Sequence, residues 1–76
     1  MTQTLEEYVG KLSDSEFARF MSNFHNGKQR AHMRQARYWR SEQRYGLMSS
    51  QLVSARVESA KARVALREAR RLENEQ

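Results

Sequence analysis

The chain has 76 residues, of which 14 are Lys or Arg and nine are Asp or Glu, so its formal net charge is +5. It contains no cysteine, which excludes disulfides and cysteine-based zinc sites. No stretch approaches the ~20 apolar residues of a membrane-spanning helix, and the N-terminal segment lacks the basic and apolar regions of a secretory signal peptide. These features predict one small cytoplasmic domain over residues 1–76, without a cofactor or a metal site.

The composition predicts an all-α fold. Proline is absent, glycine occurs three times, and most of the remaining residues are good helix formers. Apolar residues recur at helical spacing from Thr4 to about Lys11, which predicts a first short amphipathic helix. Ser13, followed three residues later by Glu16, is a capping-box pattern, so a second short amphipathic helix is expected to begin there. Its end is expected at residues 25–27, where Gly27 or Asn26 can adopt the left-handed conformation of a C-cap.

A long helical region is expected from residue 28 to residue 73, with a bend or break near Gly46. A glycine costs about 1 kcal/mol inside a helix and does not have to end it. An unbroken helix of this length would extend ~68 Å at 1.5 Å per residue. A monomer of this size cannot cover both ends of such a rod. The sequence therefore predicts a helical hairpin or small bundle that completes its core by forming a homodimer.

A stripe of small apolar residues in the segment 50–69 is the expected packing surface. Its members repeat at alternating intervals of three and four residues, which places them on one helix face. Trp39 is added to this set because a helix over residues 28–45 would place it opposite the arginines. The predicted interface residues are Trp39, Leu52, Val53, Val57, Ala62 and Leu66.

The segment 28–45, KQRAHMRQARYWRSEQRY, holds the excess of positive charge. It carries six basic side chains and one acidic one, whereas residues 1–27 carry two basic and four acidic ones. On a helix most of the arginines fall along one stripe. The guanidinium fork donates two hydrogen bonds to phosphate, and tyrosines at the edge of the stripe can stack on unpaired bases. The candidate nucleic-acid-binding residues are Arg30, Arg34, Arg37, Arg40, Arg44, Tyr38 and Tyr45.

Within this segment, RQARYWRSEQR resembles the arginine-rich RNA-binding helices of small phage and viral regulators. The small size, the composition and the lack of a catalytic motif suggest a phage or mobile-element accessory protein. Two other interpretations of the basic face stay open. It is either solvated or paired with acids of the first quarter of the chain, or it binds an acidic protein surface. The acids in question are Glu6, Glu7, Asp14 and Glu16.

No residue pattern predicts catalysis. His25 and His32 are separated by the helix break expected at Gly27, and no serine has an evident histidine and carboxylate beside it. We therefore expect a non-catalytic regulatory protein that contacts nucleic acid. The alternative is an adaptor or inhibitor that binds a host protein through the basic face or the apolar stripe. Neither a membrane nor a small-molecule substrate is an expected partner.

Overall fold

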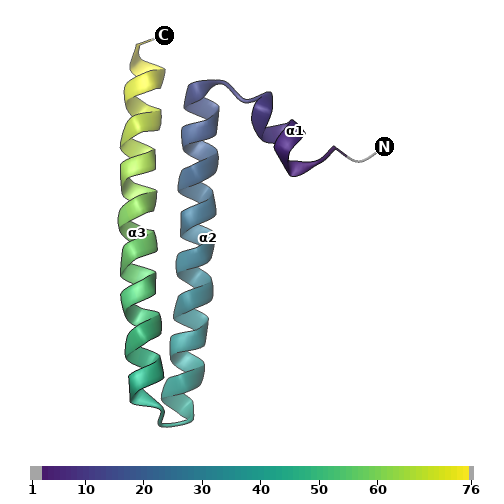
Figure 1. The fold of residues 1–76 in the computed structure, drawn as a ribbon. Coiled ribbons are helices and arrows are strands. Elements are labelled where there is room, and N and C mark those ends of the chain that lie inside the picture. Colours follow the sequence, from purple (N-terminus) through teal and green to yellow (C-terminus); the bar gives the residue numbers. More distant parts are fainter. Residues whose placement is uncertain (1–2, 76) are drawn as a thin grey trace.

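The computed structural model describes residues 3–75, and every regular element in that range is a helix. Helix α1 spans Leu5–Gly10, α2 spans Asp14–Ser41 and α3 spans Tyr45–Asn74. The two long helices run antiparallel, side by side, as a hairpin (Figure 1). The predictions of an all-α chain and of a helical hairpin are confirmed.

The start of α2 follows the predicted capping box. The Ser13 side chain accepts a hydrogen bond from the Glu16 backbone N–H at 3.2 Å, and the Ser13 backbone N–H donates to the Glu16 carboxylate at 3.0 Å. Two of the otherwise unpaired backbone donors at the helix start are thereby satisfied. These contacts lower the pKa of the Glu16 carboxyl, with the backbone hydrogen bond as the largest cause.

Helix α2 runs unbroken through residues 25–27, so the predicted end of the second helix at Gly27 is wrong. No glycine among the described residues has a positive φ, and Gly27 lies exposed in the middle of a helix of 28 residues. A glycine there costs about 1 kcal/mol relative to alanine. Packing along the rest of the helix against α3 offsets that cost, since most helix stability in proteins comes from packing of one face.

The chain reverses direction at residues 42–44, just before Gly46, near which the sequence predicts a bend or break. Gln43 adopts a φ of 57°, a left-handed conformation that only a few per cent of non-glycine residues show. Gly46 instead lies in the first turn of α3, where its carbonyl accepts a hydrogen bond from Ser50 Oγ at 3.2 Å. The helix predicted over residues 28–45 therefore ends at Ser41, and Arg44 becomes the residue that precedes α3.

The contact between α2 and α3, which we call the seam, is built from small side chains. Every buried apolar residue is an alanine, and no large side chain is fully buried among the described residues. The small residues repeat every seven positions, as in an antiparallel coiled coil. Side chains of this size let two helices approach toward the short end of the ~8–10 Å range of interaxial distances. The buried seam residues are Ser15, Ala18, Ser22, Ala36, Ala55, Glu58, Ala62 and Ala69.

One charged group, Glu58, lies inside the seam with 6% of its surface exposed. Its Oε2 atom is 2.5 Å from Nδ1 of His25, and its Oε1 atom is 3.3 Å from Nζ of Lys28 and 3.8 Å from Nζ of Lys61. The hydrogen bond with His25 is the largest cause that lowers the pKa of the Glu58 carboxyl below its usual 4.5, and Lys28 and Lys61 add to it. The buried carboxylate is thus held charged by partners from both helices.

A second polar pair repeats this arrangement one heptad nearer the turn. Nδ1 of His32 lies 2.7 Å from Oε1 of Gln51. His32 lies seven residues after His25 in α2, and Gln51 lies seven residues before Glu58 in α3. Two such pairs fix the antiparallel register, because a shift of either helix would leave buried polar groups without partners.

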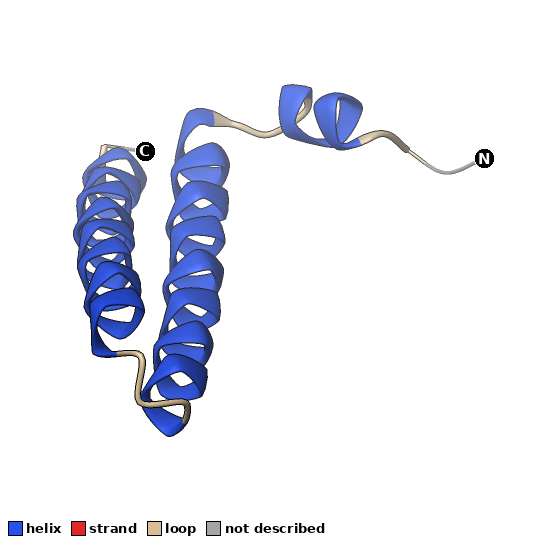
Figure 2. Ribbon diagram, turned by 60° about the horizontal axis from the view of Figure 1, so that its bottom comes forward, coloured by secondary structure: helices blue, strands red, loops and turns tan. Residues whose placement is uncertain are grey.

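The hairpin is a single layer of two helices. The described chain extends 49 × 35 × 12 Å along its principal axes. Helix α1 projects from the side of α2 that faces away from α3, where Tyr8 contacts Phe20 with ring centroids 6.1 Å apart (Figures 1 and 2). Both broad faces of the hairpin are therefore left without a covering layer.

Candidate nucleic-acid interface and the opposite apolar flank

The seam divides the hairpin surface into two flanks of different chemistry. On one side of it, α2 presents Arg37 and Arg40 and α3 presents Leu52 along a small groove. On the other side, α2 presents Phe17 and α3 presents Val64 along a larger one. Positions one heptad apart on the same helix belong to the same flank, and positions three or four residues apart are neighbours on the helix surface. We call the first face the arginine flank and the second the apolar flank.

Helix α2 supplies three of the predicted arginines to the arginine flank, namely Arg30, Arg37 and Arg40, and all three are exposed. Arg34 lies at the outer border of this flank. Arg44 does not extend the stripe, because it lies in the turn and not on the helix that the sequence predicted. The prediction of one continuous stripe along a single helix therefore needs this correction at its C-terminal end.

Helix α3 adds three exposed arginines that the sequence analysis did not select: Arg56, Arg63 and Arg70. These three arginines are spaced seven residues apart along α3. Each of them lies four residues after a residue on the arginine-flank side of this helix. Arg70 also helps to lower the pKa of Glu73, whose main partner is Arg19 and which lines a groove on this side. The heptad spacing was visible in the sequence, but only the antiparallel register shows that these arginines share a face with those of α2.

Together the six arginines form a band along the hairpin. The register places Arg70 beside the start of α2, so the band runs from there to Arg40 near the turn. This is a distance of about 27 residues, or ~40 Å at 1.5 Å per residue. The α3 arginines occupy the open half of the hairpin and the α2 arginines occupy the half near the turn.

The band is not neutralised within the chain. Among the described residues, Arg19 and Arg71 are the arginines with a carboxylate within 4.0 Å, and neither belongs to the six. The Arg19–Glu73 pair, 2.5 Å apart, closes the open end of the hairpin. None of the four acids of the first quarter forms an ion pair with the segment 28–45 in the part of the chain described. Their expected role as internal partners therefore has no support in the structure.

The aromatic residues near the turn have separate environments. Tyr38 is 54% exposed and Tyr45 is 59% exposed, so both rings are open to a ligand. Trp39 is half-buried at the end of the seam, and its ring meets that of Tyr38 edge-on with centroids 4.9 Å apart. Its position supports the expectation that Trp39 anchors packing on the side of α2 that faces away from the arginines.

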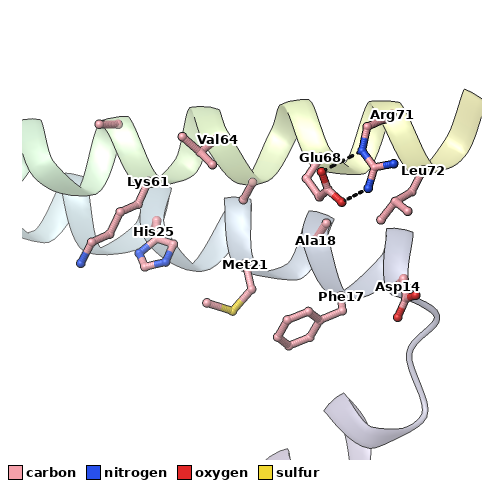
Figure 3. Close-up of a pocket in the computed structure, with 12 residues that line it drawn as sticks. Asp14, Phe17, Ala18, Met21, His25, Lys61, Val64, Glu68, Arg71 and Leu72 are labelled. Atoms are coloured by element: carbon pink, nitrogen blue, oxygen red, sulfur yellow. Dashed lines mark hydrogen bonds and ion pairs between the residues drawn. The ribbon is translucent and has the colours of Figure 1, made fainter.

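The apolar flank contains a groove of about 720 Å³ in the open half of the hairpin. Figure 3 shows its lining side chains, which come from both long helices. Phe17 and Met21 of α2 and Val64 and Leu72 of α3 supply most of its apolar wall. At its end Arg71 forms an ion pair with Glu68.

The predicted interface residues are divided among three environments. Ala62 is only 3% exposed and packs inside the seam, so it is not available to a second chain. Leu52 and Leu66 are half-buried toward the arginine flank, whereas Val57 is 47% exposed and Val53 is 61% exposed. The small-residue stripe thus serves the hairpin itself, and the apolar surface left for a partner is a different one.

The part of the chain described contains no group of three or more His, Cys, Asp or Glu side chains arranged to hold a metal ion. Over the same residues, no helix combines the length and the apolar character needed to cross a bilayer. Comparison with protein-family models, curated proteins and solved structures finds no match to this chain.

Proposed function

We propose that the protein is a non-catalytic nucleic-acid-binding protein that contacts the phosphate backbone through the arginine flank. The observation that carries the proposal is the alignment of six exposed arginines from two helices on one face, without an acidic partner among the described residues. Like charges on one face repel each other. An anionic ligand that spans both helices would relieve that repulsion.

The dimensions of the band suit a nucleic-acid backbone. Its ~40 Å length is comparable to one turn of B-form DNA, about 34–36 Å. Arginines seven residues apart on one helix recur every ~10 Å, so successive side chains can reach separate phosphates. Each guanidinium can donate two hydrogen bonds to one phosphate. The exposed ring of Tyr45 near the turn offers a stacking surface for unpaired bases, whereas Tyr38, three heptads along α2 from Phe17, belongs to the apolar flank.

A salt titration with paired variants tests this proposal. Fluorescence anisotropy would measure the affinity for a labelled duplex of about two turns, ~20 base pairs, and for a single-stranded RNA of similar length. The variant Arg56→Gln/Arg63→Gln removes two charges from the arginine flank. The control Lys11→Gln/Arg67→Gln removes two exposed charges that are neither among the six arginines nor ion-paired within the described residues, so net charge is matched.

The flank variant should lower the slope of log K against log salt by about 1.8 for duplex DNA, at ~0.9 per lost phosphate contact. The control should change it much less. Equal effects of the two variants would show that only net charge matters, which contradicts a defined interface. Absence of binding at low salt would overturn the proposal and leave the alternative, an adaptor or inhibitor that presents the same arginines to an acidic protein.

We also propose that the chain acts as a homodimer. A seam made of alanines and serines buries little apolar area, and domains of this size usually need oligomerisation, disulfides or a metal to supplement their core. The chain has no cysteine to supply disulfides.

A further inference from the structure

The open half of the apolar flank presents large apolar side chains that no layer of the described chain covers, although the Lys28 ammonium lies 5.4 Å from the centroid of the Phe24 ring. Phe17 is 43% exposed, Phe24 and Val57 are each 47% exposed, and Val64 is 63% exposed. They surround Met21 and line or extend the groove of about 720 Å³. Helix α1 lies beyond the outer side of α2 and leaves this face open (Figures 1 and 2).

The extent of this surface is in the range that a second copy requires. Full burial of a phenylalanine removes about 150–250 Å², so the exposed parts of Phe17 and Phe24 alone would bury roughly 140–220 Å² per chain. The two valines and Met21 bring the patch toward the ~300–600 Å² of a large functional patch. A standard interface buries ~800 Å² per partner, rather more than half of it apolar.

The charges around the patch select one orientation for a second copy. Asp14 and Lys28 lie seven residues on either side of Met21 along α2. A two-fold axis that passes at the level of Met21, perpendicular to the helices, therefore places Asp14 of each copy opposite Lys28 of the other. An axis parallel to the helices would instead bring Asp14 over Glu68 and Arg71, which line the same end of the groove. Arg71 is already paired with Glu68 and Glu75, so Asp14 would add a third carboxylate to one guanidinium.

We propose that the apolar flank is the interface of an antiparallel homodimer, a four-helix assembly with Met21 near its two-fold axis and Asp14–Lys28 pairs at its two ends. The two arginine flanks then face outward in opposite directions. If the nucleic-acid function proposed above holds, one dimer can bind two nucleic-acid segments at once. The dimer itself does not depend on that function, so the two proposals are tested separately.

Sedimentation equilibrium at micromolar concentration tests the interface with a matched pair of valines. Val64→Glu places a carboxylate in the patch, whereas Val53→Glu makes the same change at a side chain of the same helix with nearly equal exposure, 61% against 63%. Val53 lies ~16 Å farther along α3 and outside the groove. Val64→Glu should raise the dimer dissociation constant by roughly 100-fold or more, because a two-fold interface buries the new charge twice.

The control variant Val53→Glu should leave the dissociation constant within a few-fold of the wild type, and circular dichroism would show whether each variant stays helical. A wild-type chain that is monomeric throughout the micromolar range would overturn the proposal and assign the groove to another partner. Loss of the dimer with Val53→Glu but not with Val64→Glu would also overturn it, since the interface would then follow the sequence-based prediction.

A disulfide test does not require a weakened variant. The chain has no native cysteine, so Met21→Cys introduces a single thiol near the proposed axis and Val53→Cys a single thiol away from it. Mild oxidation should convert Met21→Cys to a covalent dimer and leave Val53→Cys mostly monomeric on a denaturing gel, because a disulfide needs Cα atoms within about 7 Å. Equal crosslinking of both variants, or none of Met21→Cys, contradicts the geometry.

Discussion

Gly27 gives the sharpest test of the fold, because sequence and structure predict opposite effects of the same substitution. In the structure Gly27 lies within α2 and has no positive φ. A Cβ atom added there would meet no other atom within 4 Å. Gly27→Ala therefore adds neither a contact nor a clash, and its effect is confined to the conformational freedom of the backbone.

The expected magnitude follows from that freedom alone. Alanine in a helix interior is more favourable than glycine by about 0.5–1 kcal/mol. For a domain of 60–100 residues, 1 kcal/mol shifts the melting temperature by about 4–8 °C. Gly27→Ala should therefore raise the melting temperature by ~2–8 °C. If the helix ended at Gly27 in a left-handed C-cap, alanine would be strained there and the shift would be negative.

Thermal unfolding followed by circular dichroism measures this shift. Wild type and variant have to be compared at the same chain concentration, since the melting temperature of a dimer depends on it. Gly10→Ala is the matched control, because Gly10 is the last residue of α1, outside the hairpin, with equally open space around it. A lower or unchanged melting temperature for Gly27→Ala would refute the continuous helix.

Two further predictions concern the polar contacts that set the ends and the register of α2. Ser13→Ala should reduce the free energy of unfolding by about 0.5–2 kcal/mol, because it removes the side-chain acceptor of the capping box. Urea denaturation would measure this loss as a lower midpoint, and an unchanged midpoint would contradict the cap. The lowered pKa of Glu58 predicts a contribution to stability that is present above pH 4.5 and is lost as the pH falls through the folded-state pKa. The melting temperature of Glu58→Gln should therefore be lower than that of the wild type at neutral pH, and the difference should disappear in acid. Glu42→Gln changes an exposed carboxyl without an ion pair in the described chain, so it should show no such pH-dependent difference. A difference between Glu58→Gln and the wild type that stays constant with pH would count against the buried carboxylate.

Local patterns in the sequence predicted the helical class and the start of the second helix. The capping box at Ser13 and Glu16 is a short-range signal, since its two hydrogen bonds join residues three positions apart. Placement of Ala36 and Trp39 opposite the arginines also follows from helical periodicity alone. Each of these features depends on residues within a single helix, and for that reason it can be predicted from the sequence.

The features that were missed depend on how one helix lies against another. Gly27 is typical of a helix end by local rules, and only the packing of α2 along its full length against α3 keeps the helix unbroken. The alignment of Arg63 with Arg30 and Arg37 depends on the antiparallel register, which no local pattern specifies. The same holds for Ala62, which was expected to contact a second chain and instead packs within its own hairpin.

The register is therefore the step that connects the buried polar residues to the proposed function. An apolar seam of alanines repeats every seven residues, so a slip of one heptad would bring alanines against alanines again and cost little by itself. The polar pairs together remove that ambiguity. A slip in one direction would set Glu58 opposite Ala18 and leave a buried carboxylate without its partner, which is strongly unfavourable. A slip in the other direction would set His25 opposite Ala65 and Gln51 opposite Trp39. A buried polar group that specifies register at some cost in stability is a known device of coiled coils. In this chain the same polar pairs also set how the arginines of the two helices align along the band, since a slip of seven residues would move the α3 half of the band ~10 Å along the α2 half.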